Sequence, residues 1–159
     1  MAFAYAQVDV SNIPIGVLKW LQYCTDVTTF STDTEPTLAQ ATTTIDQVEA
    51  EINGVLAAEG YATVPATGTA SINLLRMYVE TEAAYKLYTQ VYTPNELPPA
   101  VKAWHEDYRA FLSRLRRGEQ YLPDQQPQSE DEPFFLIVRH PERDDAFTYR
   151  TDEQDWDEP

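Results

Sequence analysis

Two histidines and one cysteine are the side chains in this sequence that most readily do chemistry. His105 stands in AWHEDY and His140 precedes PERDD, so carboxylates lie near both histidines in sequence. A positioned imidazole beside a carboxylate is a typical pair for general acid–base catalysis. In a chain with 26 acidic residues, however, such neighbours arise from composition alone. Because neither histidine has the HExxH spacing of a metal site, we expect no catalytic residue, no metal site and no enzyme.

The sequence also lacks the signatures of cofactor binding. It contains no GxGxxG, no GKS or GKT and no GxSxG, and its five glycines leave little material for loops that cradle phosphates. The single Cys24 cannot form an internal disulfide, and we expect it to be a small buried side chain. The sequence therefore predicts no cofactor, and an active surface that binds protein.

The stretch FLSRLRRGEQYLP, residues 111–123, contains the densest positive charge of an acidic chain. The formal net charge is -15, yet residues 101–118 carry five basic and two acidic groups. The macrodipole favours cations near a helix C-terminus by about 0.3–1 kcal/mol each, which accounts for one or two arginines more readily than for four. We therefore predict a contact with a neighbouring subunit or another protein through four residues: Arg109, Arg114, Arg116 and Arg117. The acidity argues against a protein that wraps nucleic acid.

Four helical segments are predicted to position these residues. The first lies near residues 12–23, with Pro14 in its opening turn. The second has apolar residues at spacings of three and four from Leu38 to Val55, an apparent capping box at its start and Gly60 at its end, while three carboxylates (Asp46, Glu49 and Glu51) face away from the apolar stripe. The third covers residues 69–92 with a tyrosine stripe. The fourth follows a second capping-box sequence, residues 93–96, and ends at Gly118.

After residue 122 the helical pattern stops. Residues 123–133 have the composition of an extended linker, residues 134–139 and 146–150 that of two short strands, and the terminus is acidic. An isolated hairpin is marginal in water, so this arm is expected to become ordered by docking, either as a hairpin or by adding to a partner's sheet. Its predicted anchors are aromatic or aliphatic: Phe134, Phe135, Ile137, Phe147, Tyr149 and Trp156. A lone Trp156 in an acidic terminus is equally compatible with having no role.

The predicted fold is therefore mainly α: a small four-helix bundle over residues 1–122, followed by an extended C-terminal arm over residues 123–159 containing one or two short β-strands. The first residues have no basic region followed by a long apolar run, and no stretch approaches the roughly 20 apolar residues of a membrane span. We expect a soluble protein made in a cytoplasm, without a membrane partner.

Three stretches in order carry a resemblance to a known family: TEPTLAQATTTIDQVEAEINGVLAAEGYATVP, LLRMYVETEAAYKLYTQ and FLSRLRRGEQYLP. Their sequence resembles the head-tail connector adaptors of long-tailed bacteriophages, the head completion proteins that bind beneath the portal. That family has a helix opening with a T-x-P-T start and closing in GY, then a Tyr- and Ala-rich helix, then a helix closing in L-x-x-L-R-x-G-E-x-x-L-P. The resemblance covers roughly residues 5–123.

The resemblance implies a structural virion protein of the neck. Such a protein forms a ring of identical subunits, usually dodecameric, that docks on the portal protein and contacts the next neck or tail protein, a stopper or a tail-completion protein. DNA passes through the channel without specific binding, for which an acidic wall is suited. In such a ring the arginines of residues 109–117 would meet carboxylates of a neighbouring copy or of the portal.

Two other functions remain open on the sequence. One is another head or tail completion protein of the same neck, although those that form stoppers and tail ends are generally β-rich. The other is a cellular, acidic helical module for protein interaction, with no virion. An enzyme would be distinguished by a cleft that contains His105 with a perturbed titration.

Overall fold

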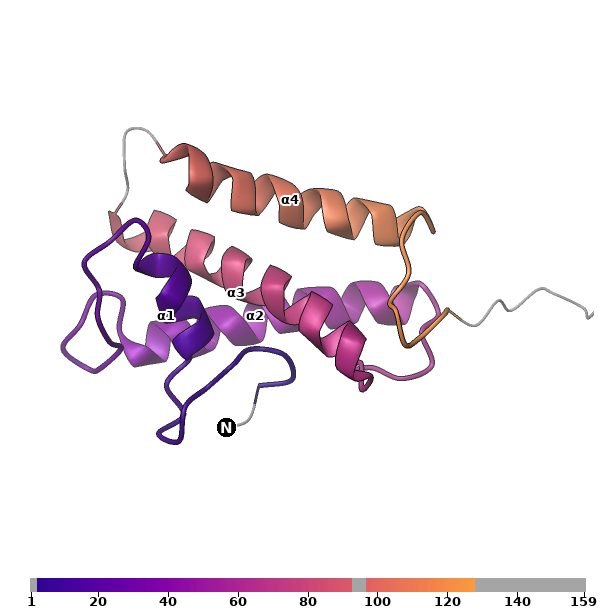
Figure 1. Cartoon of the computed structure of the whole chain (residues 1–159), viewed down its shortest axis with the longest axis horizontal. Helices are drawn as coiled ribbons and strands as arrows, with labels where there is room; N and C mark the ends of the chain where they lie inside the picture. The colour runs from indigo at the N-terminus through magenta and orange to yellow at the C-terminus, as the bar shows by residue number, and fades with distance from the viewer. Residues whose placement is uncertain (1–2, 93–96, 128–159) are drawn as a thin grey trace, which may run out of the picture. The chain divides into compact units, whose positions relative to one another are not determined.

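The computed structural model describes residues 3–92 and 97–127, which form four helices (Figure 1). Their bounds are Ile15–Leu21 for α1, Leu38–Ala58 for α2, Thr69–Tyr92 for α3 and Pro99–Arg116 for α4. These residues contain no strand, which confirms the mainly helical class for this part of the chain. The predicted strands at 134–139 and 146–150, and the six anchors of the arm, lie outside the described residues.

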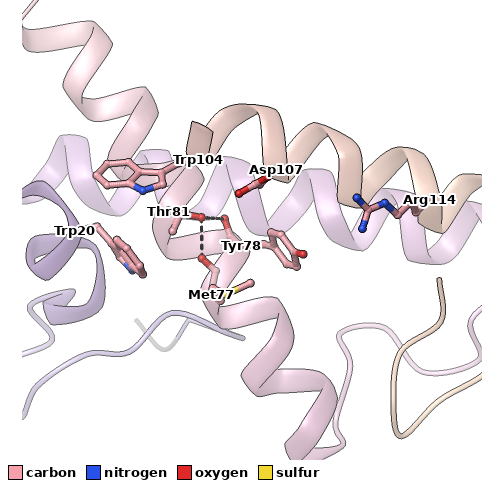
Figure 2. A pocket seen from close by; sticks show the side chains of 7 residues that line it. All are labelled: Trp20, Met77, Tyr78, Thr81, Trp104, Asp107 and Arg114. Atoms are coloured by element: carbon pink, nitrogen blue, oxygen red, sulfur yellow. Dashed lines mark hydrogen bonds between the residues drawn. The ribbon is translucent and has the colours of Figure 1, made fainter. Parts of the chain in front are cut away.

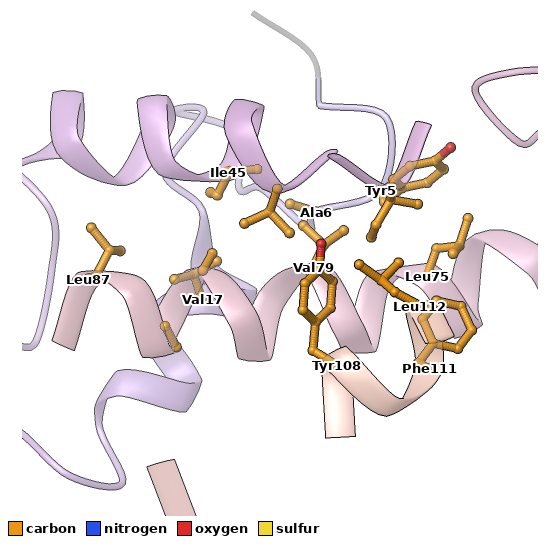
Figure 3. Packing of buried hydrophobic residues seen from close by; sticks show 14 of the residues in the cluster. Tyr5, Ala6, Val17, Ile45, Leu75, Val79, Leu87, Tyr108, Phe111 and Leu112 are labelled. Atoms are coloured by element: carbon orange, nitrogen blue, oxygen red, sulfur yellow. The ribbon is translucent and has the colours of Figure 1, made fainter. Parts of the chain in front are cut away.

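The core forms around α3, which contacts each of the other three helices. Figure 3 shows side chains from all four helices meeting there, with Val17 from α1, Ile45 from α2, Val79 from α3 and Phe111 from α4 fully buried. In α3 the buried stripe is aliphatic, through Leu75, Val79, Ala83 and Leu87, and the tyrosines flank it. Burying such side chains stabilises the fold by about 1.5–3 kcal/mol each for the larger ones.

Local signals set most of the helix ends. At the start of α2, the Thr37 hydroxyl accepts from the Gln40 backbone N–H and the Gln40 side chain accepts from the Thr37 N–H, which is a capping box. Gly60 and Gly118 have φ of 77° and 64°, the left-handed geometry that closes α2 and α4. At both ends the following residue also donates to a carbonyl five residues earlier, as in a Schellman motif.

Two of the predicted helix starts are wrong. Pro14 is the N-cap of α1 rather than part of its first turn, so α1 is shorter than residues 12–23. Pro98 is the N-cap of α4 and Pro99 its first residue, where a missing N–H costs no hydrogen bond. The capping-box sequence at residues 93–96 therefore does not start α4, and those four residues lie outside the described part of the chain.

The N-terminal segment is held against the bundle by buried carboxylates. Glu49 is 7% exposed and accepts hydrogen bonds from the backbone N–H groups of Ala4, Tyr5 and Ala6 at 2.8, 2.8 and 3.0 Å. Glu80 on α3 accepts from the Gln7 N–H at 3.0 Å. The prediction that Glu49 faces away from the core is wrong, because its partners are main-chain donors that no helical periodicity reveals.

The last residue of the predicted bundle domain, Leu122, and the second residue of the predicted linker, Asp124, both pack on the helices. Leu122 is 2% exposed, and its N–H donates to the Tyr61 hydroxyl at 3.3 Å. The Asp124 carboxylate accepts from the Ser71 N–H at 3.0 Å in the first turn of α3, and the Asp124 N–H donates to the Ser71 hydroxyl at 3.0 Å. This reciprocal pair caps α3 from 53 residues away. A Cβ at Gly68 would overlap the Asp124 carboxylate, so this position requires glycine.

Candidate interaction surface

The four arginines predicted as an interface are all exposed, but they do not share one face of α4. At 3.6 residues per turn, Arg109 and Arg116 lie within about 20° of each other around the helix axis. Arg114 lies about 140° from Arg109 and on the same side of the helix as Asp107. The sequence cluster is therefore divided between two edges of α4, on either side of its buried stripe.

Local ion pairing accounts for one of these arginines. The Arg117 guanidinium lies 3.0 Å from the Glu119 carboxylate, with both side chains more than half exposed. A pair this exposed contributes about 0–1 kcal/mol. Within residues 3–92 and 97–127, no carboxylate lies within 4.0 Å of the guanidinium of Arg109, Arg114 or Arg116. These three cations are open to a partner that brings carboxylates.

A groove of about 310 Å³ lies where α1, α3 and α4 meet, and we call it the tryptophan groove (Figure 2). Trp20 of α1 and Trp104 of α4 approach edge to face, with ring centroids 5.5 Å apart and planes at 70°. Figure 2 shows Met77 on α3 near Tyr78 and Thr81, and Asp107 and Arg114 along α4. Seven residues line the groove: Trp20, Met77, Tyr78, Thr81, Trp104, Asp107 and Arg114.

A second hollow continues the tryptophan groove along α1 and shares Trp20 and Met77 with it. It adds two cations, Lys19 and Arg76, and the buried carboxylate of Glu80. Burial raises the pKa of Glu80, partly offset by the hydrogen bond from Gln7 and by the nearby Arg76. The two hollows together place an aromatic floor between cations on α1, α3 and α4.

The residues of the tryptophan groove are held by packing beneath them. Tyr78 stacks on the buried Phe111, with centroids 4.0 Å apart and planes at 11°. Burial raises the pKa of Tyr78, so its hydroxyl stays protonated at neutral pH. The Thr81 hydroxyl donates to the Met77 carbonyl at 2.8 Å and needs no other partner. Packing and a hydrogen bond therefore hold two of the seven lining residues, Tyr78 and Thr81, in place.

His105 is tied to a buried carboxylate rather than facing a cleft. Its Nδ1 lies 3.0 Å from Oε2 of Glu82, which is 1% exposed, and its ring stacks on Tyr85 at 4.3 Å. Burial raises the pKa of Glu82, partly offset by His105 and Lys86. Neither His105 nor Glu82 lines the tryptophan groove. The pair joins α3 to α4, and in this arrangement its evident role is to fasten the two helices.

Among the described residues, no group of three or more His, Cys, Asp or Glu side chains is arranged to hold a metal ion. Among the same residues, no helix is both long and apolar enough to cross a membrane. The Cys24 thiol is free and half-buried, and donates weakly to the Leu21 carbonyl at 3.4 Å.

Trp104 falls within the apolar spacing of the fourth predicted helix, but the sequence does not predict the tryptophan groove. Trp20 and Met77 belong to different helices, and nothing in their spacing indicates that they meet Trp104. The only available signal was the excess of large aromatic side chains near the edges of the predicted apolar stripes.

Searches of family models, curated proteins and solved structures found no match to this chain.

Proposed function

We propose that this chain is a structural protein of a bacteriophage neck, a head-tail connector adaptor that assembles as a ring on the portal. The observation that carries the proposal is the set of exposed arginines on α4, in a chain whose net charge is -15. A ring uses a head-to-tail interface, in which one surface of a subunit meets a different surface of the next. Exposed arginines and an acidic body provide two such complementary surfaces on one molecule.

The helical body supports the same proposal. The three stretches that resemble the adaptor family fall on α2, α3 and α4, and the GY and RRGE sequences coincide with the glycine caps at Gly60 and Gly118. An acidic chain also suits a channel for DNA, because clustered cations facing the channel would bind phosphate and retard passage. The C-terminal arm would reach onto the portal or an adjacent subunit through its six anchors.

The test of this function is quantitative mass spectrometry of purified virus particles from the source. We expect this chain in the particles, in a fixed ratio near one to one with the portal subunit. Its absence from particles would refute the neck assignment and favour a cellular interaction module. A presence at a few copies per particle would instead favour another completion protein of the neck.

A charge reversal tests the interface directly. The triple variant R114E/R116E/R117E should abolish ring assembly on the portal while leaving the helical circular dichroism signal unchanged. Reversal of two exposed carboxylates outside α4, D33K and E35K, serves as the control for a surface charge reversal as such, although it changes the net charge by +4 where the triple variant changes it by -6. Normal assembly by the triple variant would show that these arginines are not at the interface.

A further inference from the structure

Large apolar side chains in and beside the tryptophan groove remain exposed to solvent. Met77 is 45% exposed and Tyr23, whose ring lies 5.8 Å from Trp20, is 70% exposed. Trp20 and Trp104 are only partly buried. Large aromatic and methionine side chains that form an open hollow are typical of surfaces that receive an anchor from another segment.

The rim of this hollow carries cations, against the charge of the chain as a whole. Arg114 borders the tryptophan groove on α4, and Lys19 and Arg76 border its continuation. Of the two carboxylates there, Glu80 is 7% exposed and already accepts the Gln7 N–H, so Asp107 is the one at the surface. An occupant that brings both an aromatic anchor and negative charge therefore matches the hollow.

Of the segments that combine an aromatic side chain with carboxylates, the last one in the sequence has the densest negative charge. Residues 152–158 read DEQDWDE, with five carboxylates around Trp156. The other two tryptophans of the chain, Trp20 and Trp104, are those that line the groove. An indole can pack against two indole rings and the Met77 thioether, while the carboxylates on either side of it face Lys19 and Arg114. The segment therefore matches both the aromatic floor and the cations of the hollow.

The length of chain before this segment allows it to reach another molecule. Residues 128–151 separate it from the last described residue, Pro127, and 24 residues span up to about 80 Å when extended. The whole of α4, with 18 residues, is only about 27 Å long. The intervening chain is therefore long enough for the segment to bind a neighbouring molecule.

We propose that the tryptophan groove binds the acidic, Trp156-bearing C-terminal segment of a neighbouring copy of this chain. The proposal deepens the proposed function and rests on it for the choice of a neighbouring copy, because a tail that enters the next groove is a head-to-tail contact that repeats around a ring. Trp156 packs in the groove against Trp20, Met77 and Trp104, and the carboxylates beside it pair with Arg114 and Lys19. Residues 134–149 remain available to the portal.

The test uses the full-length chain with 5-fluorotryptophan, which gives one ¹⁹F NMR signal for each tryptophan. Trp→Phe variants at positions 20, 104 and 156 assign the three signals. At high protein concentration, W156A should move the Trp20 and Trp104 signals, and so should R114E in the wild-type background. R116E lies on the opposite edge of α4 and F147A changes another aromatic residue of the arm, so both controls should leave the groove signals in place. Dilution or high salt should move the wild-type signals to the W156A positions.

A mixing experiment identifies the source of the tail. Labelled W156A chains have an intact groove without an anchor, whereas unlabelled R114E chains have an anchor and a weakened groove. Mixing them should return the labelled Trp20 and Trp104 signals toward the wild-type, high-concentration positions. If W156A differs from wild type but mixing has no effect and dilution changes nothing, the chain's own tail fills the groove and the proposal is overturned. If W156A leaves both groove signals unchanged, the tail does not bind there at all.

These outcomes are separate from the fate of the proposed function. Absence of the chain from virus particles, with the mixing effect intact, would refute the neck assignment while keeping the contact between copies. A one-to-one ratio with the portal, without any effect of W156A, would keep the neck assignment and overturn this inference.

Discussion

Glu49 should be one of the most important polar side chains for the stability of this fold. Its carboxylate is buried and accepts three backbone hydrogen bonds from residues 4–6. Hydrogen bonds to a charged group contribute about 1.5–3 kcal/mol each. Three bonds to one carboxylate are not additive, and the N-terminal segment can detach into water once they are lost. We therefore expect E49A to lower the free energy of unfolding by about 3 kcal/mol.

In a chain of this length 1 kcal/mol corresponds to about 2–4 °C, so the melting temperature of E49A should fall by about 6–12 °C. Hydrogen exchange provides the second measurement, because the amides of residues 4–6 should lose their protection. E51A is the matched control on the same helix. Its carboxylate is exposed and lies 3.4 Å from the Lys86 ammonium, so the loss of this ion pair should cost no more than about 1 kcal/mol.

The segment held by Glu49 also supports the tryptophan groove. The Gln7 carbonyl accepts from the Gly16 N–H at the start of α1, and the Tyr5 carbonyl accepts from Arg76 at 3.2 Å. Loss of the segment should therefore loosen Trp20 and change its fluorescence before the bundle unfolds. Unchanged amide protection at residues 4–6 in E49A, with stability equal to that of E51A, would refute this account.

Three further predictions concern pH, a helix cap and the arm. Burial raises the pKa of Glu80 in the folded protein above its value in the unfolded chain. The protonated form therefore adds stability at a pH below the unfolded pKa, and this contribution is lost as the pH rises through the folded pKa. The stability of wild type minus that of E80Q should thus decrease between pH 4 and pH 7 in chemical denaturation, and a constant difference would contradict the assignment. D124A removes the carboxylate that accepts from the Ser71 N–H but keeps the main-chain N–H that donates to the Ser71 hydroxyl. The loss of this cap should cost about 0.5–2 kcal/mol, measured by urea unfolding, whereas a cost near zero would mean that water replaces the carboxylate. Deletion of residues 133–159 should preserve helical circular dichroism and abolish co-sedimentation with portal; surviving attachment would show that the arm is not the anchor.

The helices could be predicted because their signals are local. The capping box at Thr37, the glycines at positions 60 and 118 and the apolar spacing of α2 each act within a few residues, and the structure has each of them where the sequence indicates. The start of α4 was predicted wrongly because two local signals, a capping-box sequence and a pair of prolines, lie close together. Pro98 and Pro99 start the helix, and a capping-box sequence a few residues earlier does not.

What the sequence could not show are contacts between polar groups far apart in the chain. Glu49 meets residues 4–6, and Asp124 meets Ser71, across 43 to 53 residues. A carboxylate on a helix is normally solvated. Its burial becomes favourable only where backbone N–H groups from elsewhere in the chain donate hydrogen bonds to it. The same limit applies to the tryptophan groove, whose lining comes from three helices.

The division of the α4 arginines bears on how a ring could form. A closed ring needs two different surfaces on each copy, and a single basic face would supply only one of them. Arg114 belongs to the tryptophan groove, whereas Arg109 and Arg116 lie on the other edge of the helix and Arg117 is paired with Glu119. One helix thus places cations on two separate surfaces, the first lined by aromatic side chains and the second open to carboxylates. For this reason the triple reversal changes both surfaces at once, and only the comparison of R114E with R116E separates the contact made by the tail from a contact made by charge alone.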